Sequence, residues 1–271
     1  MARFVIAPQW QGSPSARAMM LVDGAQAIAG DLPRAACTSL EVPLEAGEAI
    51  ETGVHRYSAL LRVREALDEI LADRGEHTVV IGGDCGISPA VIAAAAAAMP
   101  HLAVVWLDAH ADLNVPATSP SGAFSGMALS AVLGDGPETL AVHPGIPPLR
   151  VVLAGVRAYD AGEAERAERL GGVLSADELA EPDALATAVQ ATGADAVYVH
   201  LDLDVLDPAA LGGVTSPVPF GIDVAPLVAA LRRLRAAVPL VGATIAGFAP
   251  PSPAAAGDDL GAILRVVGAL A

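Results

Sequence analysis

The sequence predicts an α/β protein: a mostly parallel β-sheet with helices packed on both of its faces. Two observations point to this class. Short runs rich in valine, isoleucine and leucine alternate with helical patterns along the chain. In addition, the clearest of these runs are apolar at every position, which indicates strands that are buried on both sides, as parallel strands are when helices cover both faces of their sheet.

Six runs are apolar enough to be expected as strands. In chain order they are Phe4–Ala7, Thr78–Ile81, Leu102–Leu107, Val151–Ala154, Ala196–Leu201 and Val241–Ile245. Between and after them, apolar residues at helical spacing predict helices over Ser58–Arg74, Ala225–Ala237 and Asp258–Leu270. A further helix is expected around the alanine run Ala93–Ala98, with Ser88 as its N-cap and Pro89 at its first position.

Length and composition restrict the class of protein. A chain of 271 residues without an internal repeat, linker or charge block is expected to fold as one domain over residues 1–271. The net charge of −16 argues against nucleic acid and anionic membranes as partners, and the longest uncharged apolar run, Ala90–Met99, is too short to span a bilayer. The N-terminus shows no signal-peptide pattern, and two cysteines, Cys37 and Cys85, make no disulfide framework, so a cytoplasmic protein is expected.

All fifteen basic residues are arginines. The absence of lysine excludes Schiff-base chemistry, a pyridoxal-phosphate anchor and the phosphate-binding lysine of a P-loop. Any chemistry must therefore come from carboxylates, histidine, cysteine, hydroxyl groups, arginine or a bound metal.

Polar side chains follow four of the expected strands where those strands end. Strand by strand, they are Asp84 and Cys85; Asp108, His110 and Asp112; Arg157, Tyr159 and Asp160; and Asp202, Asp204 and Asp207. In open α/β sheets, ligands bind at the carboxyl ends of the strands. Residues two apart share one side of an extended chain, so each of these Asp-rich segments is expected to present its side chains to one face.

Several carboxylates that meet in a partly dry site need a compensating cation. A mixed shell of carboxylate oxygens and imidazole suits Mn²⁺, with iron, cobalt and zinc as alternatives. Each segment alone has a simpler interpretation, because DLDVLDP (202–208) also suits a solvated turn and DAHAD (108–112) the acidic start of a helix. The presence of both segments at strand ends favours the metal site.

Four motifs in this chain resemble those of the ureohydrolase superfamily, which contains arginases, agmatinases and formiminoglutamases. In the family's order they are GGD (82–84), DAHADLN (108–114), SGAFSGM (121–127) and DLDVLDP (202–208). The resemblance extends from about Thr78 to Pro250. It implies a three-layer α/β/α sandwich on a mostly parallel sheet and a homo-oligomer, either a trimer or a hexamer.

The family's metal site, carried over residue by residue, implies two Mn²⁺ ions with a shared hydroxide. Asp108 and Asp202 would bridge the two ions. His110 and Asp204 would complete the shell of one ion. Asp112 would bind the other ion and could accept a hydrogen bond from the hydroxide, so that it is also an expected catalytic residue.

Three departures from the family's pattern fall in this site. Cys85 replaces the histidine of the common GGDH motif, where sulfur would favour Zn²⁺ or Fe²⁺, although a buried cysteine also suits a packing role. Ser125 stands at the second expected catalytic position, where arginases have a proton-shuttling histidine, and it equally suits an ordinary loop serine. Gly247 stands where a glutamate pairs with the substrate guanidinium. Poor hydrolysis of arginine is therefore expected, and Gly247→Glu with Ser125→His is expected to raise residual urea release.

The family's substrate-binding residues are better represented. Asn114 and Ser121 stand where arginases hold the α-carboxylate of the substrate, and Asp160 and Glu163 where they contact its α-amino group. The last two also suit the acidic start of a helix expected over Tyr159–Leu170.

Three functions remain open. The resemblance favours a metal-dependent hydrolase that cleaves a C–N bond of a small-molecule amidine or amide other than arginine or agmatine, because five of six expected ligands are kept. The alternatives are a homologue that has lost catalysis and keeps its metal for a structural or binding role, and a deacylase on the same fold.

Overall fold

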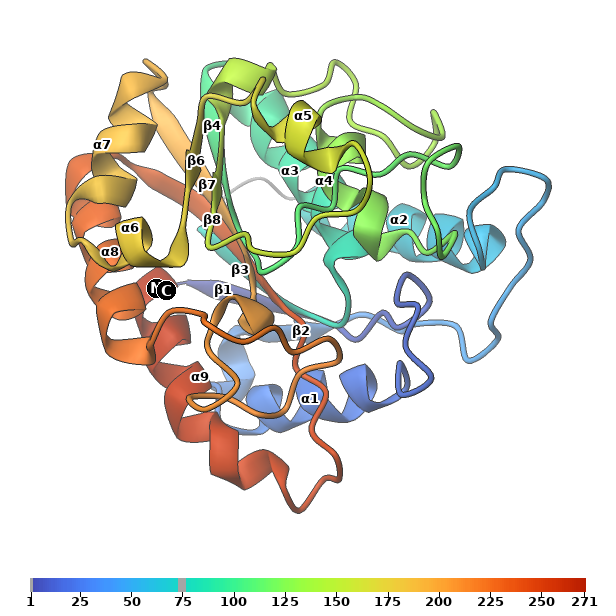
Figure 1. Cartoon of the computed structure of the whole chain (residues 1–271). Coiled ribbons are helices and arrows are strands. Elements are labelled where there is room, and N and C mark those ends of the chain that lie inside the picture. The colour runs from blue at the N-terminus through green and yellow to red at the C-terminus, as the bar shows by residue number, and fades with distance from the viewer. Residues whose placement is uncertain (1, 73–76) are drawn as a thin grey trace.

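A computed structural model describes residues 2–72 and 77–271. Within these residues, eight strands form one sheet in the order β2–β1–β3–β8–β7–β4–β5–β6, and all neighbours are parallel (Figure 1). The strands are β1 (Arg3–Ala7), β2 (Cys37–Ser39), β3 (Thr78–Gly82), β4 (Leu102–Leu107), β5 (Val151–Ala154), β6 (Gly172–Leu174), β7 (Ala196–Asp202) and β8 (Leu240–Ala246).

Helices cover both faces of this sheet (Figure 1). On one face lie α1 (Met20–Gly30), α6 (Ala176–Ala180), α7 (Ala184–Ala191), α8 (Val224–Ala237) and α9 (Ala256–Leu270); on the other lie α2 (Tyr57–Leu71), α3 (Ser88–Ala98), α4 (Ala128–Val132) and α5 (Glu163–Ala167). Short 3₁₀ turns connect the elements: η1 (Arg34–Ala36), η2 (Cys85–Ile87), η3 (Ser125–Met127), η4 (Pro148–Arg150) and η5 (Leu203–Val205). The expected three-layer α/β/α sandwich is confirmed.

All six expected strands are present, and those over Leu102–Leu107 and Val151–Ala154 have the expected bounds. The helix expected over Ser58–Arg74 appears as α2, while Arg74 lies outside the described residues. The two edge strands β2 and β6 were not expected, because each has only three residues and neither is fully buried.

Two helix expectations were wrong in their details. Ser88 is the first residue of α3 rather than its N-cap, and its hydroxyl lies 2.7 Å from Nδ1 of His200. The helix expected over Tyr159–Leu170 is limited to α5, because Gly162 adopts φ +85° and the chain before it turns instead of coiling.

Side chains along the central strands point alternately to the two faces of the sheet, and this decides which of them reach the site. In β4, Val104 and Trp106 pack toward α2 and α3, while Val105 and the other intervening residues pack toward the opposite helices. Asp108 continues the Trp106 row beyond the strand end, as Asp202 continues the Tyr198 row of β7. Both carboxylates therefore emerge on the α3 side of the sheet.

Arg157 holds the loop after β7 against the end of β5. Its guanidinium donates hydrogen bonds to six carbonyl oxygens, those of Gly155, Asp204, Val205, Leu206, Val218 and Pro219. Because an arginine fork is rigid and always charged, these bonds fix the backbone that carries Asp204.

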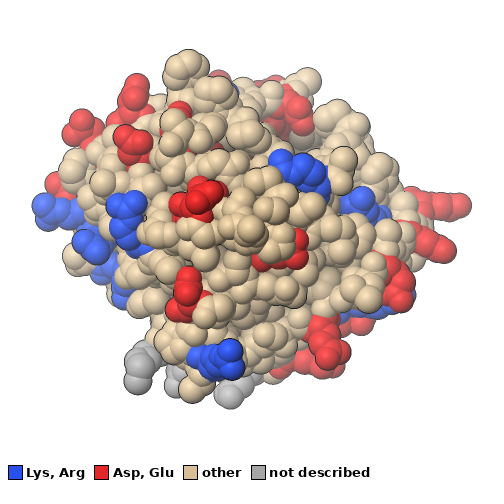
Figure 2. All heavy atoms as spheres, turned by 90° about the horizontal axis from the view of Figure 1, so that it is seen from below, with Lys and Arg blue, Asp and Glu red and all other residues tan. Residues whose placement is uncertain are grey.

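On the face seen in Figure 2, most of the surface is uncharged, with basic side chains gathered toward the left edge and many of the acidic ones toward the right. None of the helices in the described part of the chain is both long and apolar enough to cross a membrane.

Candidate active site

A cavity of about 240 Å³ lies at the carboxyl ends of the central strands. Strands β3, β8, β7 and β4 are successive neighbours, which brings the segments that follow them together. Every site residue expected from the sequence lines this cavity: Cys85, Asp108, His110, Asp112, Asn114, Ser121, Ser125, Asp160, Glu163, Asp202 and Asp204. Ser13, Thr215 and Ser216 line it as well, and no motif marked them.

Three strand-end aspartates share one local geometry. Each accepts a hydrogen bond at Oδ1 from the backbone N–H two residues further on, at 2.9 Å for Asp84, 2.7 Å for Asp108 and 2.8 Å for Asp202. Asp84 has a structural role, because Gln9 and Gly12 also donate to its two oxygens. Asp108 and Asp202 use Oδ1 for the turn and direct Oδ2 toward Cys85.

These turns correct the expectation of extended chain after the strands. The segment after β4 bends at Ala109, and Asp112 adopts the left-handed φ of +52° that few residues other than glycine occupy. After β7, Asp204 lies in the 3₁₀ turn η5. The carboxylates meet through these tight turns rather than through the side-chain alternation of a strand.

His110 lies between two carboxylates. Its Nδ1 is 2.9 Å from Oδ2 of Asp204 and 3.4 Å from Oδ1 of Asp108. Burial opposes protonation of the imidazole, but the hydrogen bonds and charges of the two carboxylates outweigh it and raise the pKa of His110 to about 12. Burial also opposes ionisation of Asp108, yet its histidine neighbours hold the pKa of that carboxyl well below its usual range.

The other side of the cluster carries excess negative charge. Sγ of Cys85 lies 3.0 Å from Oδ2 of Asp202 and 3.7 Å from Oδ2 of Asp108. Burial and these carboxylates raise the pKa of the thiol, and burial and neighbouring carboxylates raise the pKa values of Asp112 and Asp202 well above the usual range. Burial raises the pKa of Asp204 to about 6. A bound cation would relieve this repulsion.

The residues present fit a divalent metal. Candidate ligand atoms form two groups, and within each group all atoms lie within 4.8 Å of one another. One group comes from Asp108, His110 and Asp204, and the other from Cys85, Asp108 and His200. In addition, Oδ2 of Asp112 and Nε2 of His200 are buried and have no hydrogen-bond partner among the described residues. Buried polar atoms without partners are rare, and metal coordination would satisfy both.

His200 is not among the site residues that the sequence predicts. It lies inside β7, within a run whose apolar residues predict a buried strand. The available signal was its position two residues before Asp202, which places both side chains on the same face of the sheet.

A hydrogen-bonded group forms another part of the cavity wall. Oε1 of Glu163 accepts from the backbone of Leu113 at 2.8 Å and from Asn114 Nδ2 at 3.2 Å, and Oε2 accepts from the backbone of Asp160 at 2.7 Å. Asn114 Nδ2 also donates to Asp160 Oδ2 at 2.8 Å. Glu163 is buried and holds its neighbours in place, whereas Asp160 is exposed and available to a ligand.

Gly247 directly follows β8, the strand that lies between β3 and β7. It adopts φ +87°, and a Cβ added there would lie 2.1 Å from Oδ1 of Asp202. The expectation that Gly247→Glu with Ser125→His raises residual urea release is therefore corrected, because a side chain at position 247 displaces Asp202.

Comparisons with known proteins identify the family of this chain. The arginase of Brevibacillus brevis is 38% identical over 189 residues, which cover 64% of this chain and 63% of that protein, and the arginase of Bacillus caldovelox is 35% identical over 199 residues, 67% of each chain. The crystal structure of Entamoeba histolytica arginase with L-ornithine has the same fold, with a TM-score of 0.85 and 23% identity over 99% of this chain and 97% of that one. The model of the arginase family matches residues 17–267, and the chain belongs to that family.

Proposed function

We propose that the protein is a divalent-metal-dependent hydrolase that cleaves a C–N bond of a small amidine or amide, and that L-arginine and agmatine are poor substrates. The observation that carries this proposal is the buried cluster at the strand ends, in which Oδ2 of Asp112 has no partner among the described residues. A divalent ion bound by this cluster supplies Lewis acidity and activates water for attack.

The donor atoms suggest which ions bind. Asp108, His110 and Asp204 offer oxygen and imidazole, a set that suits Mn²⁺, the ion that the family resemblance implies. Cys85 adds a soft sulfur on the other side of the cluster, which suits Zn²⁺ or Fe²⁺.

In this proposal, Asp112 interacts with the water that attacks the substrate. Its backbone carbonyl accepts hydrogen bonds from Leu129 at 3.0 Å and Ser130 at 3.2 Å, which fixes the turn that carries the side chain. Its Oδ2 has no hydrogen-bond partner among the described residues, so that it can accept a hydrogen bond from the attacking water. Ser125 lines the cavity and can orient a substrate by hydrogen bonding, but its hydroxyl cannot carry a proton near neutral pH.

The cavity suits a small cationic substrate. Its volume of about 240 Å³ accommodates a molecule of amino-acid size, and the lining residues in the described part of the chain include several acids and no arginine. The exposed carboxylate of Asp160 is available to an ammonium group, with Asn114 hydrogen-bonded to it and Ser121 elsewhere on the cavity wall. The amidine or amide end would face the metal cluster without a paired carboxylate at Gly247.

A homologue that has lost catalysis is the second candidate. The observation that favours it is Gly247, whose packing against Asp202 leaves no room for the guanidinium-binding side chain. In that case the metal cluster would serve binding or structure.

A trimer or hexamer in the cytoplasm is a further proposal from the family resemblance. Sedimentation velocity tests the oligomeric state.

The test is release of ammonia and urea from a panel of guanidino, formamidino and amide compounds by protein reconstituted with Mn²⁺, Zn²⁺ or Fe²⁺. We expect metal-dependent release from at least one compound other than arginine and agmatine, and loss of that release in Asp202→Asn. Metal-loaded protein that acts on none of the compounds would support the homologue without catalysis.

A further inference from the structure

His200 holds an imidazole behind the cavity with one ring nitrogen unused. The side chain is fully buried, and its Nδ1 lies 2.7 Å from Oγ of Ser88 at the start of α3. The ring stacks on Trp106 of the neighbouring strand, with centroids 3.6 Å apart and planes inclined by 24°. These two contacts fix the orientation of the ring, and Nε2 on its opposite edge has no hydrogen-bond partner among the described residues.

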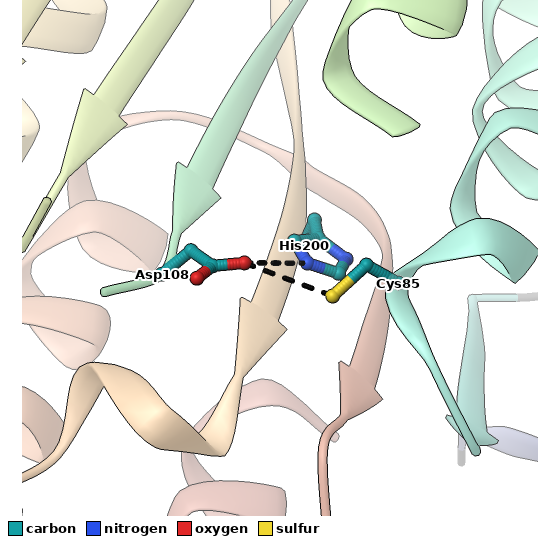
Figure 3. Close-up of side chains that lie close together, drawn as sticks. All are labelled: Cys85, Asp108 and His200. Carbon is teal, nitrogen blue, oxygen red and sulfur yellow. Dashed lines mark hydrogen bonds and ion pairs between the residues drawn. The ribbon is translucent and has the colours of Figure 1, made fainter. Parts of the chain in front are cut away.

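Nε2 points into the sulfur-containing side of the cluster. It lies 3.9 Å from Oδ2 of Asp108, and together with Sγ of Cys85 these atoms lie within 4.8 Å of one another. Figure 3 shows the three side chains converging from η2, the end of β4 and β7. A fourth atom, Oδ2 of Asp202, lies 3.0 Å from the sulfur.

The sulfur, the Asp108 oxygen and the His200 nitrogen are spaced closely enough to bind one zinc ion. Zinc bonds of about 2.0 Å to oxygen or nitrogen and about 2.3 Å to sulfur place neighbouring ligand atoms about 3.3–3.5 Å apart. The separations here are slightly longer, at 3.7 Å from Sγ to Asp108 Oδ2 and 3.9 Å from Asp108 Oδ2 to Nε2. A direct hydrogen bond between Nε2 and Asp108 is excluded at 3.9 Å.

We propose that Cys85 Sγ, Asp108 Oδ2 and His200 Nε2 bind one Zn²⁺ ion, so that His200 supplies the imidazole missing at position 85. This inference deepens the proposed function and rests on its metal centre. Binding requires a lone pair on Nε2, which means that Nδ1–H donates to Ser88 Oγ, and coordination releases the thiol proton to solvent. A thiolate, an imidazole and carboxylates together are typical zinc ligands.

X-ray absorption at the zinc edge tests the ligand set directly. The measurement uses full-length His110→Asn protein, because this change removes the other imidazole of the cluster. We expect one sulfur and one imidazole on the bound zinc, with the imidazole signal lost in His110→Asn/His200→Asn and the sulfur signal lost in His110→Asn/Cys85→Ser. Asparagine at 200 can keep the contact with Ser88, and His200→Gln provides a second variant if the first is unfolded by circular dichroism.

Zinc affinity, measured by chelator competition, separates a ligand from a supporting residue. Loss of a residue that only supports a ligand lowers metal affinity by about 10–100-fold, which is the effect expected for Ser88→Ala, whereas His200→Asn should exceed about 100-fold. Cys37→Ser is the matched thiol control, because Cys37 lies at the start of β2 away from the cavity, and it should leave the affinity unchanged.

Each outcome decides the inference. An imidazole signal that survives the His200 changes, or zinc bound through oxygen alone, overturns the inference and leaves the proposed hydrolase intact. Failure of the protein to bind any divalent ion overturns both the inference and the proposed function.

Discussion

Replacing Gly247 with alanine should displace the carboxylate of Asp202 and destabilise the protein. The Cβ of the new residue would lie 2.1 Å from Oδ1 and 2.6 Å from Cγ of Asp202. This carboxylate is buried, with Oδ1 accepting from the backbone of Asp204 at 2.8 Å and Oδ2 facing the Cys85 thiol at 3.0 Å. It cannot move without breaking at least one of these contacts.

Two contributions set the size of the effect. A residue with a Cβ in the left-handed region costs about 1–2 kcal/mol relative to glycine. Leaving a buried hydrogen-bonding group without its partner costs about 1–3 kcal/mol. The free energy of unfolding should therefore fall by about 2–5 kcal/mol in Gly247→Ala.

Gly193→Ala separates the two contributions. Gly193 also has a left-handed φ, +68°, but no atom lies within 4 Å of a Cβ added there. Urea denaturation should show a loss of only about 1–2 kcal/mol for this control. Equal losses in the two variants would refute the reasoning, as would release of urea from arginine by Gly247→Glu.

Three further outcomes are expected. Cys85→His should shift the preference of the protein from Zn²⁺ toward Mn²⁺, because imidazole suits harder ions better than thiolate does. Competition titration measures the ratio of the two affinities, and an unchanged ratio would make Cys85 a packing residue. Arg157→Lys should lower the free energy of unfolding by about 2–3 kcal/mol in urea, because lysine cannot replace the fork that holds six carbonyl oxygens, and a loss below about 0.5 kcal/mol would contradict this. Without metal, the free energy of unfolding should fall as the pH rises from about 4 to about 6, because burial raises the pKa of Asp204 from 3.8 to about 6. In this range the folded state retains a proton that the unfolded state releases. Urea denaturation in the presence of a chelator measures this, and a stability that rises with pH would contradict the shift.

The sequence predicted the features that depend on local pattern. The continuous apolar runs of β4 and β7 identified buried parallel strands, and the topology rule for such sheets placed the DAHAD and DLDVLDP segments at one edge. The edge strands β2 and β6 escaped because three partly exposed residues carry no such pattern.

Features that depend on packing could not be read from the sequence. The left-handed turn at Asp112 is held by hydrogen bonds from Leu129 and Ser130, which lie far along the chain. Ser88 is of a residue type that is common at N-caps, yet its hydroxyl contacts His200 in β7. The missing glutamate at Gly247 was visible in the sequence, but the lack of room for a Cβ beside Asp202 appears only in the structure.

Elemental analysis of the purified, reconstituted protein tests most directly whether the strand-end cluster binds a divalent metal. Wild-type protein should retain at least about one equivalent of Mn²⁺ or Zn²⁺ after gel filtration. Asp202→Asn should lose most of this metal, whereas Asp207→Asn, in the same loop but outside the cavity lining, should retain it. Less than about a tenth of an equivalent of every ion in the wild-type protein, or equal retention by the two variants, would contradict the metal centre.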